Sequence, residues 1–285
     1  MRGAEVFGVV MVFILSLGDT LRFADDLDFN LELIKHQPCN YRNDTAKWER
    51  KLEFEGGNDK NGPKLKTRES DGPNCYSIGG RVHVLKEFKG DFSIYLEIKS
   101  TANKKQVPES CKDQKANGCG GFGSCLYCNA CETFGQNVGV KAELLLNEKL
   151  IKCGEALSPG VYDNIELLFC LPSINDILVS QGLSVETFKT LIQSEDGQGL
   201  RSMGIFATVY VFDTDVSKTM QMQANIERVY RQQSKPSLFQ DEPLPPEVYW
   251  NLPFNKMIRE QKEFIACHKL YGNVKITPLM SGRTG

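Results

Sequence analysis

The chain has 285 residues, enough to bury a sizeable apolar core, and its 34 Lys and Arg against 36 Asp and Glu leave a formal net charge of −2. This balance, with no basic stripe interleaved with aromatic residues, excludes nucleic acid as an expected partner. The length suits one large domain or two small ones, and we take it as a single domain behind a short leader.

The N-terminus predicts a secretory signal peptide over residues 1–18. A basic residue precedes an apolar run from Val6 to Leu17, and small residues stand just before Asp19. The run is too short to cross a bilayer, which takes roughly 20 residues. We therefore expect a mature chain, 19–285, that is soluble and secreted or lysosomal.

Ten cysteines behind a signal peptide predict an even set of disulfides, formed in an oxidising compartment. Their number alone does not give the connectivity. Asn43 lies in an N-x-[ST] sequon and is a predicted glycosylation site, with an unmodified loop asparagine as the alternative. The predicted disulfide cysteines are Cys39, Cys75, Cys111, Cys119, Cys125, Cys128, Cys131, Cys153, Cys170 and Cys267.

Alternating apolar and polar residues predict a series of strands. The clearest case, F-S-I-Y-L-E-I-K from Phe92, places Phe92, Ile94, Leu96 and Ile98 on one face and Tyr95 on the other. Similar alternation recurs over residues 138–146, 165–169, 204–212, 264–268 and 274–276. Strands spaced by glycine-rich turns predict an all-β, antiparallel, disulfide-rich sandwich, immunoglobulin-like, or a β-cup, with short helical insertions.

The second half of the chain holds a predicted insertion over about 172–263. Ser173 with Asp176 resembles a capping box, and apolar residues at helical spacing follow, which predicts a helical region over 174–193. Four prolines between 234 and 246 predict an extended connection. The insertion is interpreted either as a contact surface with a function of its own or as decoration of a surface loop.

Half of the cysteines fall between Cys111 and Cys131, around the glycine-rich stretch N-G-C-G-G-F-G-S-C. The C-x2-C-x2-C run from Cys125 to Cys131 has a spacing at which thiolates can converge on zinc or an iron–sulfur cluster. The secretory context and the missing Cys-Pro of bacterial ferredoxins favour disulfides instead. We expect no metal and no cofactor.

This region resembles the ML-type lipid-recognition family, most nearly its lysosomal ganglioside activators. G-S-C-L-Y-C-N-A-C-E from Gly123 is similar to that family's G-S-C-x5-C-[DE] stretch, and P-G-V-Y from Pro159, following Cys153, resembles its C-P-x3-G-x-Y segment. F-I-A-C-H-K-L-Y from Phe264 lies where the family's last cysteine-bearing strand falls. The similarity covers roughly residues 75–170 and scattered strands beyond.

The resemblance implies an ML-like form of the predicted sandwich, a disulfide connectivity and a function. It pairs Cys39 with Cys267, Cys111 with Cys125, and Cys131 with Cys153, and it leaves four cysteines without a family counterpart: Cys75, Cys119, Cys128 and Cys170. It also implies a non-catalytic protein that extracts, carries or presents a lipid or glycolipid. Its further partners would be a membrane surface and a partner hydrolase or receptor.

If the two sheets splay apart, their inward apolar side chains line a cavity that an acyl chain can fill, at on the order of 0.8 kcal/mol per buried CH2. The alternative is an ordinary packed core, which alternation does not distinguish. The candidate lipid-binding residues, with the last two as a lid, are Ile94, Leu96, Leu144, Leu146, Ile165, Leu167, Phe169, Phe206, Phe212, Ile177 and Phe188.

Trp250 and Phe254 lie in an aromatic and apolar stretch followed by Lys256 and Arg259. This composition suits contact with an anionic membrane surface. A loop that plugs the main domain explains it equally well.

Two alternative functions remain, an enzyme and a protein-interaction module. Asp213 and Asp215 end an apolar strand at a spacing that can hold Mg²⁺ or Mn²⁺ against a phosphate, as in a metal-dependent glycosyltransferase or phosphatase, although a strand followed by an acidic turn accounts for them more simply. The three histidines, His36, His83 and His268, are interpreted as structural or exposed. The other alternative is a secreted interaction module, a ligand or adhesion protein with a filled core.

Overall fold

The computed structural model describes most of the chain after residue 20. The described residues are 21–23, 27–39, 49–55, 64–71, 75–89, 92–103, 105–111, 114–121, 123–130, 141–170, 203–233, 244–261 and 263–278. Several predictions lie outside them: the signal peptide 1–18, the sequon at Asn43, Cys131, and the helical region 174–193 with Ile177 and Phe188. The side chains of Phe169 and Cys170 also lie outside the described part.

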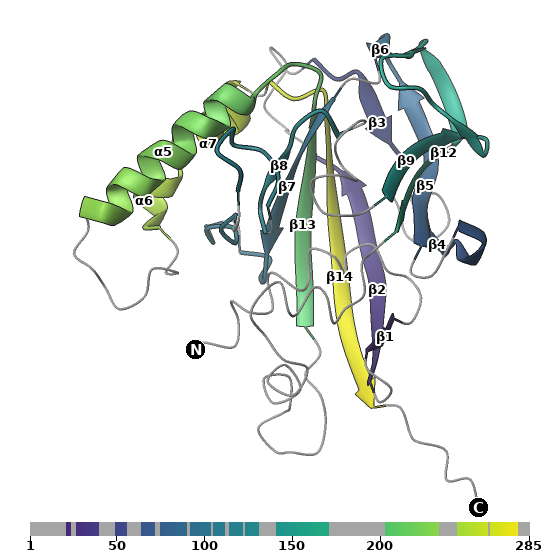
Figure 1. Ribbon diagram of the computed structural model, residues 1–285, viewed down its shortest axis with the longest axis horizontal. Helices are drawn as coiled ribbons and strands as arrows, with labels where there is room; N and C mark the ends of the chain where they lie inside the picture. Colours follow the sequence, from purple (N-terminus) through teal and green to yellow (C-terminus); the bar gives the residue numbers. More distant parts are fainter. Residues whose placement is uncertain are drawn as a thin grey trace, which may run out of the picture.

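Most of the described chain forms antiparallel β-sheets, drawn as arrows in Figure 1. Sheet A has the strand order β1 (Leu21–Phe23), β2 (Leu27–Pro38), β14 (Ala266–Pro278), β13 (Met203–Phe212), β7 (Ser93–Lys99), β8 (Leu126–Tyr127). Sheet B has the order β10 (Lys149–Leu150), β9 (Lys141–Leu146), β12 (Gly160–Cys170), β5 (Cys75–Val84), β3 (Leu52–Phe54), and β4 (Lys64–Thr67) also pairs with β5. A small ribbon joins β6 (Phe88–Lys89) to β11 (Ala156–Leu157).

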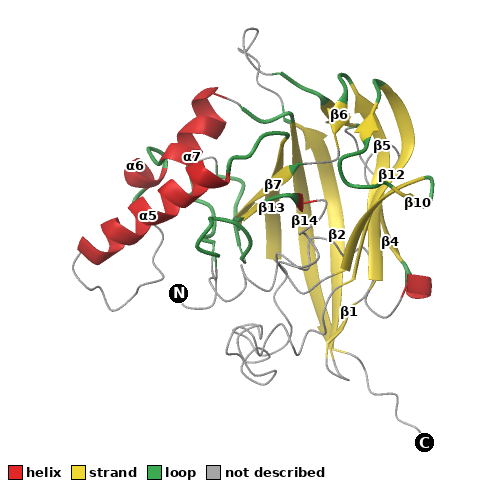
Figure 2. Ribbon diagram, turned by 45° about the horizontal axis from the view of Figure 1, so that its top comes forward, coloured by secondary structure: helices red, strands yellow, loops and turns green. Residues whose placement is uncertain are grey.

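Helices are few in the described residues, and most of them gather at one side of sheet A (Figure 2). They are α5 (Ser217–Gln233), α6 (Pro246–Tyr249), α7 (Pro253–Lys256) and the π-helical turn η3 (Met257–Gln261). A single 3₁₀ turn, η2 (Glu69–Asp71), follows β4. The prediction of an antiparallel, disulfide-bonded β fold with helical additions is confirmed.

The two sheets pack on each other through an apolar cluster, here called the inter-sheet cluster. Strands β3, β5 and β12 contribute from sheet B, and β13 and β14 contribute from sheet A. Its buried members are Leu52, Val82, Val84, Phe88, Ile151, Leu157, Ile165, Val211, Ile265 and Ala266. Two sheets that share a core in this way are compatible with the predicted β-sandwich.

Strand β13 lies inside sheet A, between β7 and β14. Its Val209 pairs with Leu96 on one side and with His268 on the other. The predicted insertion over 172–263 therefore contains β13, an internal strand of sheet A. Its helices, α5, α6, α7 and η3, form a separate layer beside the sheet, here called the helical layer. The predicted strand over 204–212 is confirmed.

The outer face of sheet A is buried against the helical layer. The cluster between them, here called the helical-layer cluster, contains Cys39, Tyr95, Leu126, Tyr210, Phe212, Val216, Met220, Phe254, Met257, Ile258, Phe264 and Cys267. Tyr95 is almost fully buried there, although alternation placed it on the polar face of its strand. The alternation divides the residues of β7 between its two faces as the structure does, but it does not reveal that both faces are buried.

Disulfides crosslink sheet A and the cysteine-rich loop beside it. Cys39 is bonded to Cys267 and Cys111 to Cys125, which are two of the pairs implied by the family resemblance. Cys119 is bonded to Cys128 within the same loop. Cys75 and Cys153 are also disulfide-bonded. The thiol groups that could have formed a metal site are thus held in disulfides at Cys125 and Cys128.

The glycine of the G-S-C motif has a clear steric role. Gly123 has a φ of +101°, and a Cβ atom there would lie 2.2 Å from the carbonyl oxygen of Ser110. Only glycine accepts both the left-handed backbone and this approach. The backbone at Gly123 therefore passes close to the segment that carries Cys111, which is bonded to Cys125 two residues further on.

Burial of Phe254 predicts a large loss of stability on truncation. Phe254→Ala should lower the free energy of unfolding by about 3–5 kcal/mol, because it removes a ring that packs against Tyr95 and Phe212. Urea denaturation measures the change. Val229→Ala, on the exposed side of α5, is the control and should change it by less than about 1 kcal/mol. A loss of stability below about 1 kcal/mol for Phe254→Ala would contradict the buried position of this ring.

Candidate functional site

The facing surfaces of the two sheets hold most of the predicted lipid-binding residues. Residues directly opposite each other in a strand pair share a face, so Ile94 and Leu96 of β7 lie on the same face of sheet A as Val211 and Val209. Because Val211 belongs to the inter-sheet cluster, this is the face turned toward sheet B.

Sheet B contributes from two neighbouring strands. Ile165 is buried in the inter-sheet cluster, and Leu144 and Leu146 pack against that cluster. Leu167 pairs with Leu144 and therefore shares their face. These positions line the inner surface of sheet B.

Phe206 and Phe212 lie on the other face of sheet A. Phe212 is fully buried in the helical-layer cluster against Phe254 and Phe264. Phe206 packs edge-to-face on Tyr271 and has the same strand parity as Phe212. The predicted lining is therefore two sets of residues separated by sheet A, and these two phenylalanines do not face the space between the sheets.

The inner faces are packed unevenly along the strands. Val82, Val84, Val211 and Ala266 are buried where the sheets meet in the inter-sheet cluster. In contrast, Ile94, Leu96, Leu144, Leu146, Leu167 and Val209 are only partly buried. On sheet A, Leu96 and Val209 lie between the buried Val211 and the buried pair Ile98 and Ala207. The partly buried apolar surface is therefore a patch within the inner faces, and it is the surface on which an apolar ligand could lie.

Two buried histidines lie beside this surface. His36 of β2 and His268 of β14 stack with ring centroids 5.6 Å apart, and the edge of Phe54 from sheet B approaches His268. Within the described residues, neither ring nitrogen of His268 has a hydrogen-bond partner. Burial, and then the neighbouring His36, lower the pKa of His268 to about 4, so it is neutral at physiological pH.

The predicted membrane-contact residues are both held within the helical layer. Phe254 is fully buried, so it is not available to a membrane surface in this structure. Trp250 is partly buried against Tyr249, with the charged groups of Lys99 and Arg259 over its ring at 5.3 and 4.5 Å. These contacts fit the alternative interpretation, in which the stretch plugs the main domain.

The two carboxylates at the end of β13 have separate structural partners. Asp213 accepts a hydrogen bond and ion pair from the Lys51 ammonium. Asp215 accepts a hydrogen bond of 2.9 Å from the backbone N–H of Ser217. The Ser217 side chain, and then this backbone bond, lower the pKa of the Asp215 carboxyl. Asp215 therefore satisfies a free amide at the first residue of α5. No cluster of three His, Cys, Asp or Glu side chains suited to a metal ion occurs among the described residues.

A buried polar network joins α5 to α7. The side-chain oxygen of Gln223 accepts hydrogen bonds from the backbone N–H groups of Phe254 and Asn255, at 3.1 and 3.2 Å. Its amide nitrogen donates to Glu227 at 3.2 Å. Burial raises the pKa of the Glu227 carboxyl, so its charged form is disfavoured. This network fixes α7 against α5.

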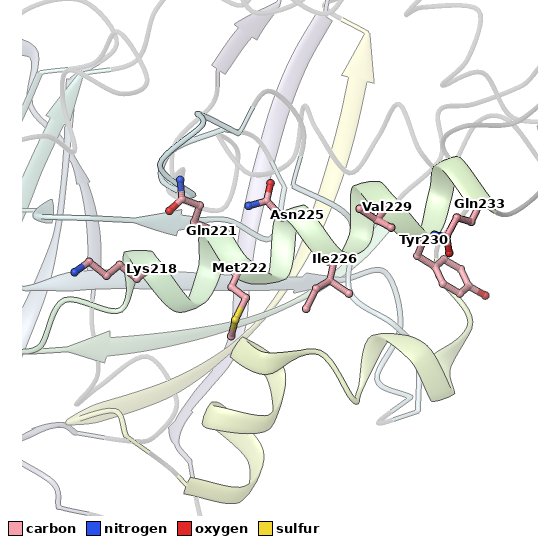
Figure 3. Close-up of a pocket in the computed structure, with 8 residues that line it drawn as sticks. All are labelled: Lys218, Gln221, Met222, Asn225, Ile226, Val229, Tyr230 and Gln233. Atoms are coloured by element: carbon pink, nitrogen blue, oxygen red, sulfur yellow. The ribbon is translucent and has the colours of Figure 1, made fainter.

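The opposite side of α5 is apolar and exposed. Met222, Ile226 and Val229 expose 50, 42 and 45% of their surface. They lie in a surface hollow of roughly 540 Å³, together with Lys218, Asn225 and Tyr230 (Figure 3).

Helix α5 was not among the elements predicted from sequence, because two of its inward positions are the polar residues Gln223 and Glu227. The signal that could have found it is the run of strong helix formers after Asp215, with no glycine or proline before Pro236.

Comparisons with known proteins identify no family for this chain: no protein-family model and no curated protein matches it. Among the described residues, no helix is long and apolar enough to cross a membrane.

Buried His268 predicts a loss of stability in acid. Its pKa is lower in the folded protein than the value of about 6.5 in an unfolded chain, so below that pH the unfolded state binds a proton that the folded state does not. The free energy of unfolding should fall as the pH drops from about 6.5, and the loss, up to about 3 kcal/mol, is complete below about pH 4. Urea denaturation of wild type and His268→Leu from pH 7.5 to 4 should show a flatter profile for the variant. Equal profiles would contradict this assignment.

The raised pKa of Glu227 predicts the opposite pH dependence: this residue should stabilise the folded protein in acid. Its pKa is raised on folding, so the protonated form stabilises the protein in acid, and this contribution is lost as the pH rises through the folded pKa. Glu227→Gln keeps an acceptor for Gln223 without the buried charge, and should add on the order of 1 kcal/mol of stability at pH 7 and less in acid. Thermal denaturation at both pH values measures the difference. Glu247→Gln, exposed on α6, is the control, and a destabilised Glu227→Gln would be the contrary result.

Proposed function

We propose that this protein is a secreted or lysosomal, non-catalytic lipid- or glycolipid-binding protein that carries or presents its ligand between its two β-sheets. The proposal includes the finer fold assignment, an ML-like sandwich or cup. The ligand's acyl chains would lie on the inner faces of the sheets, and its polar headgroup would remain outside.

The observation that carries the proposal is the incomplete burial of apolar residues on facing surfaces. A filled core buries such residues completely, as it does around Val82 and Val84. Leu96, Leu144 and Leu167 lie on the same inner faces but stay partly exposed. An acyl chain laid along them removes this surface from water at about 25 cal/mol per Å².

The disulfides support the finer assignment. The resemblance to the ML-type family implied the pairs Cys39–Cys267 and Cys111–Cys125, and both bonds are present. The first joins the end of β2 to β14 and so secures one edge of sheet A. Cys119–Cys128 is an addition that the resemblance did not imply.

A non-catalytic role is favoured over the metal-dependent alternative. The carboxylates of Asp213 and Asp215, which that alternative requires, are engaged by Lys51 and by the first amide of α5. Membrane contact through Phe254 is not part of the proposal, because the ring is fully buried.

The proposal predicts that lipid accompanies the purified protein. The full chain, expressed through a secretory pathway and purified without detergent, should release a stoichiometric amount of lipid into organic solvent, and native mass spectrometry should show the matching mass difference. Delipidated protein should transfer a fluorescent ganglioside between vesicles. Protein that is fully oxidised yet carries no lipid and transfers none would overturn the proposal.

Substitutions test the location. Leu96→Phe fills part of the inner face and should reduce bound lipid at least fivefold while leaving the thermal midpoint within a few degrees. Leu96→Lys should abolish binding, because it places a charge on that face. Leu85→Lys, at an exposed position in the loop after β5, is the matched control and should retain wild-type lipid content. Full retention by both Leu96 variants would exclude this surface.

A further inference from the structure

The exposed side of α5 has the pattern of a helix-pairing seam. Met222, Ile226 and Val229 follow a spacing of four and then three residues, which places them in one narrow stripe along the helix. The opposite side is used for packing, since Met220 and Gln223 are buried toward α7 and sheet A. The stripe is therefore additional to the packing of the fold.

The width of the stripe distinguishes between two kinds of partner. A helix that lies in a bilayer interface needs a broad apolar face, whereas a strict four-three stripe has the width of a seam between two helices. The stripe has polar amides along one flank. In Figure 3, Gln221 and Asn225 project from the side of α5 opposite to Met222 and Ile226. This arrangement favours a second helix as the occupant, recognised through apolar anchors at helical spacing.

The charges on α5 favour an acidic partner helix. The hollow contains the cation Lys218, and its described lining includes no acidic residue. Along its length α5 carries Lys218, Arg228 and Arg231 against Glu227 alone, and Glu227 is turned inward to Gln223. Lys218 is therefore the one charged side chain in the described lining of the hollow, and Arg228 and Arg231 add positive charge elsewhere on the helix. Pairing with a second copy of α5 would set two cationic helices side by side in either direction, which disfavours self-association.

We propose that the outer side of α5 is a docking surface for an amphipathic, acidic α-helix of a partner protein. The apolar side chains of that helix would pack on Met222, Ile226 and Val229, and its carboxylates would pair with Lys218. An interface confined to one helix is small, which places it among transient contacts with dissociation constants in the micromolar range. This inference goes beyond the proposed lipid binding and does not depend on it.

The test uses the full-length protein and a synthetic probe. The probe is a fluorescent helical peptide with Leu at its seam positions and Glu at the flanking ones, and the control peptide carries Lys in place of every Glu. Fluorescence anisotropy should show at least tenfold tighter binding of the acidic peptide, with affinity that falls as salt rises. Equal binding of both peptides, or binding of neither, overturns the proposal.

Variants localise the contact. Ile226→Gln, and separately Val229→Gln, should weaken binding of the acidic peptide about tenfold, and Lys218→Gln should reduce the preference for the acidic over the basic peptide. Leu150→Gln, at a similarly exposed apolar position on β10, is the control and should bind like wild type. Unchanged affinity in both seam variants overturns the proposal, and circular dichroism verifies that each variant is folded.

Two other occupants give distinct outcomes. Flotation with phosphatidylserine vesicles that depends on Ile226, in a protein that ignores the acidic peptide, would assign the surface to membranes and overturn the proposal. Concentration-dependent dimers in light scattering that Ile226→Gln abolishes would assign it to a second copy, with the same consequence. Lipid content measured on the same preparations reports separately on the proposed function.

Discussion

The structure depends on sheet A being buried on both faces. Strand β13 sends Val211 into the inter-sheet cluster and the next residue, Phe212, into the helical-layer cluster. Neighbouring strands share this division, since Tyr95 and Cys267 face the helices while Ala266 faces sheet B. One sheet thus holds two independent layers in place. The Cys39–Cys267 disulfide and the central position of β13 secure the sheet on which both layers depend.

This constraint explains which parts of the fold could be predicted from sequence. Strand positions such as 93–99 and 203–212 follow from apolar residues at alternate positions, and the antiparallel class follows from their spacing. The burial of Tyr95 could not be read in the same way, because a tyrosine in an alternating strand looks solvent-exposed until a helical layer covers it. Separation of Phe206 and Phe212 from Leu96 likewise depends on which strands pair, and that information is not local.

The helical layer was harder to predict for a related reason. Helix α5 turns Gln223 and Glu227 inward, where Gln223 accepts hydrogen bonds from two amides at the start of α7. A polar residue that satisfies buried backbone groups can replace an apolar one at an inward position, but it erases the apolar period that marks a helix. Phe254 shows the converse: an aromatic residue in a short, proline-bounded stretch suggested a membrane tip, although the ring completes the core beneath α5 and α7.

The same division separates the two proposed binding surfaces. Leu96 and Val209 face sheet B, while the stripe of Met222, Ile226 and Val229 lies on the far side of the helical layer. Between them are the rings of Tyr95, Phe212 and Phe254, and close-packed interiors of this kind resist gradual deformation. A ligand between the sheets and a helix on α5 therefore need not compete for space. Any coupling between the two sites has to pass through sheet A, where strand β13 turns Val211 to one face and Phe212 to the other.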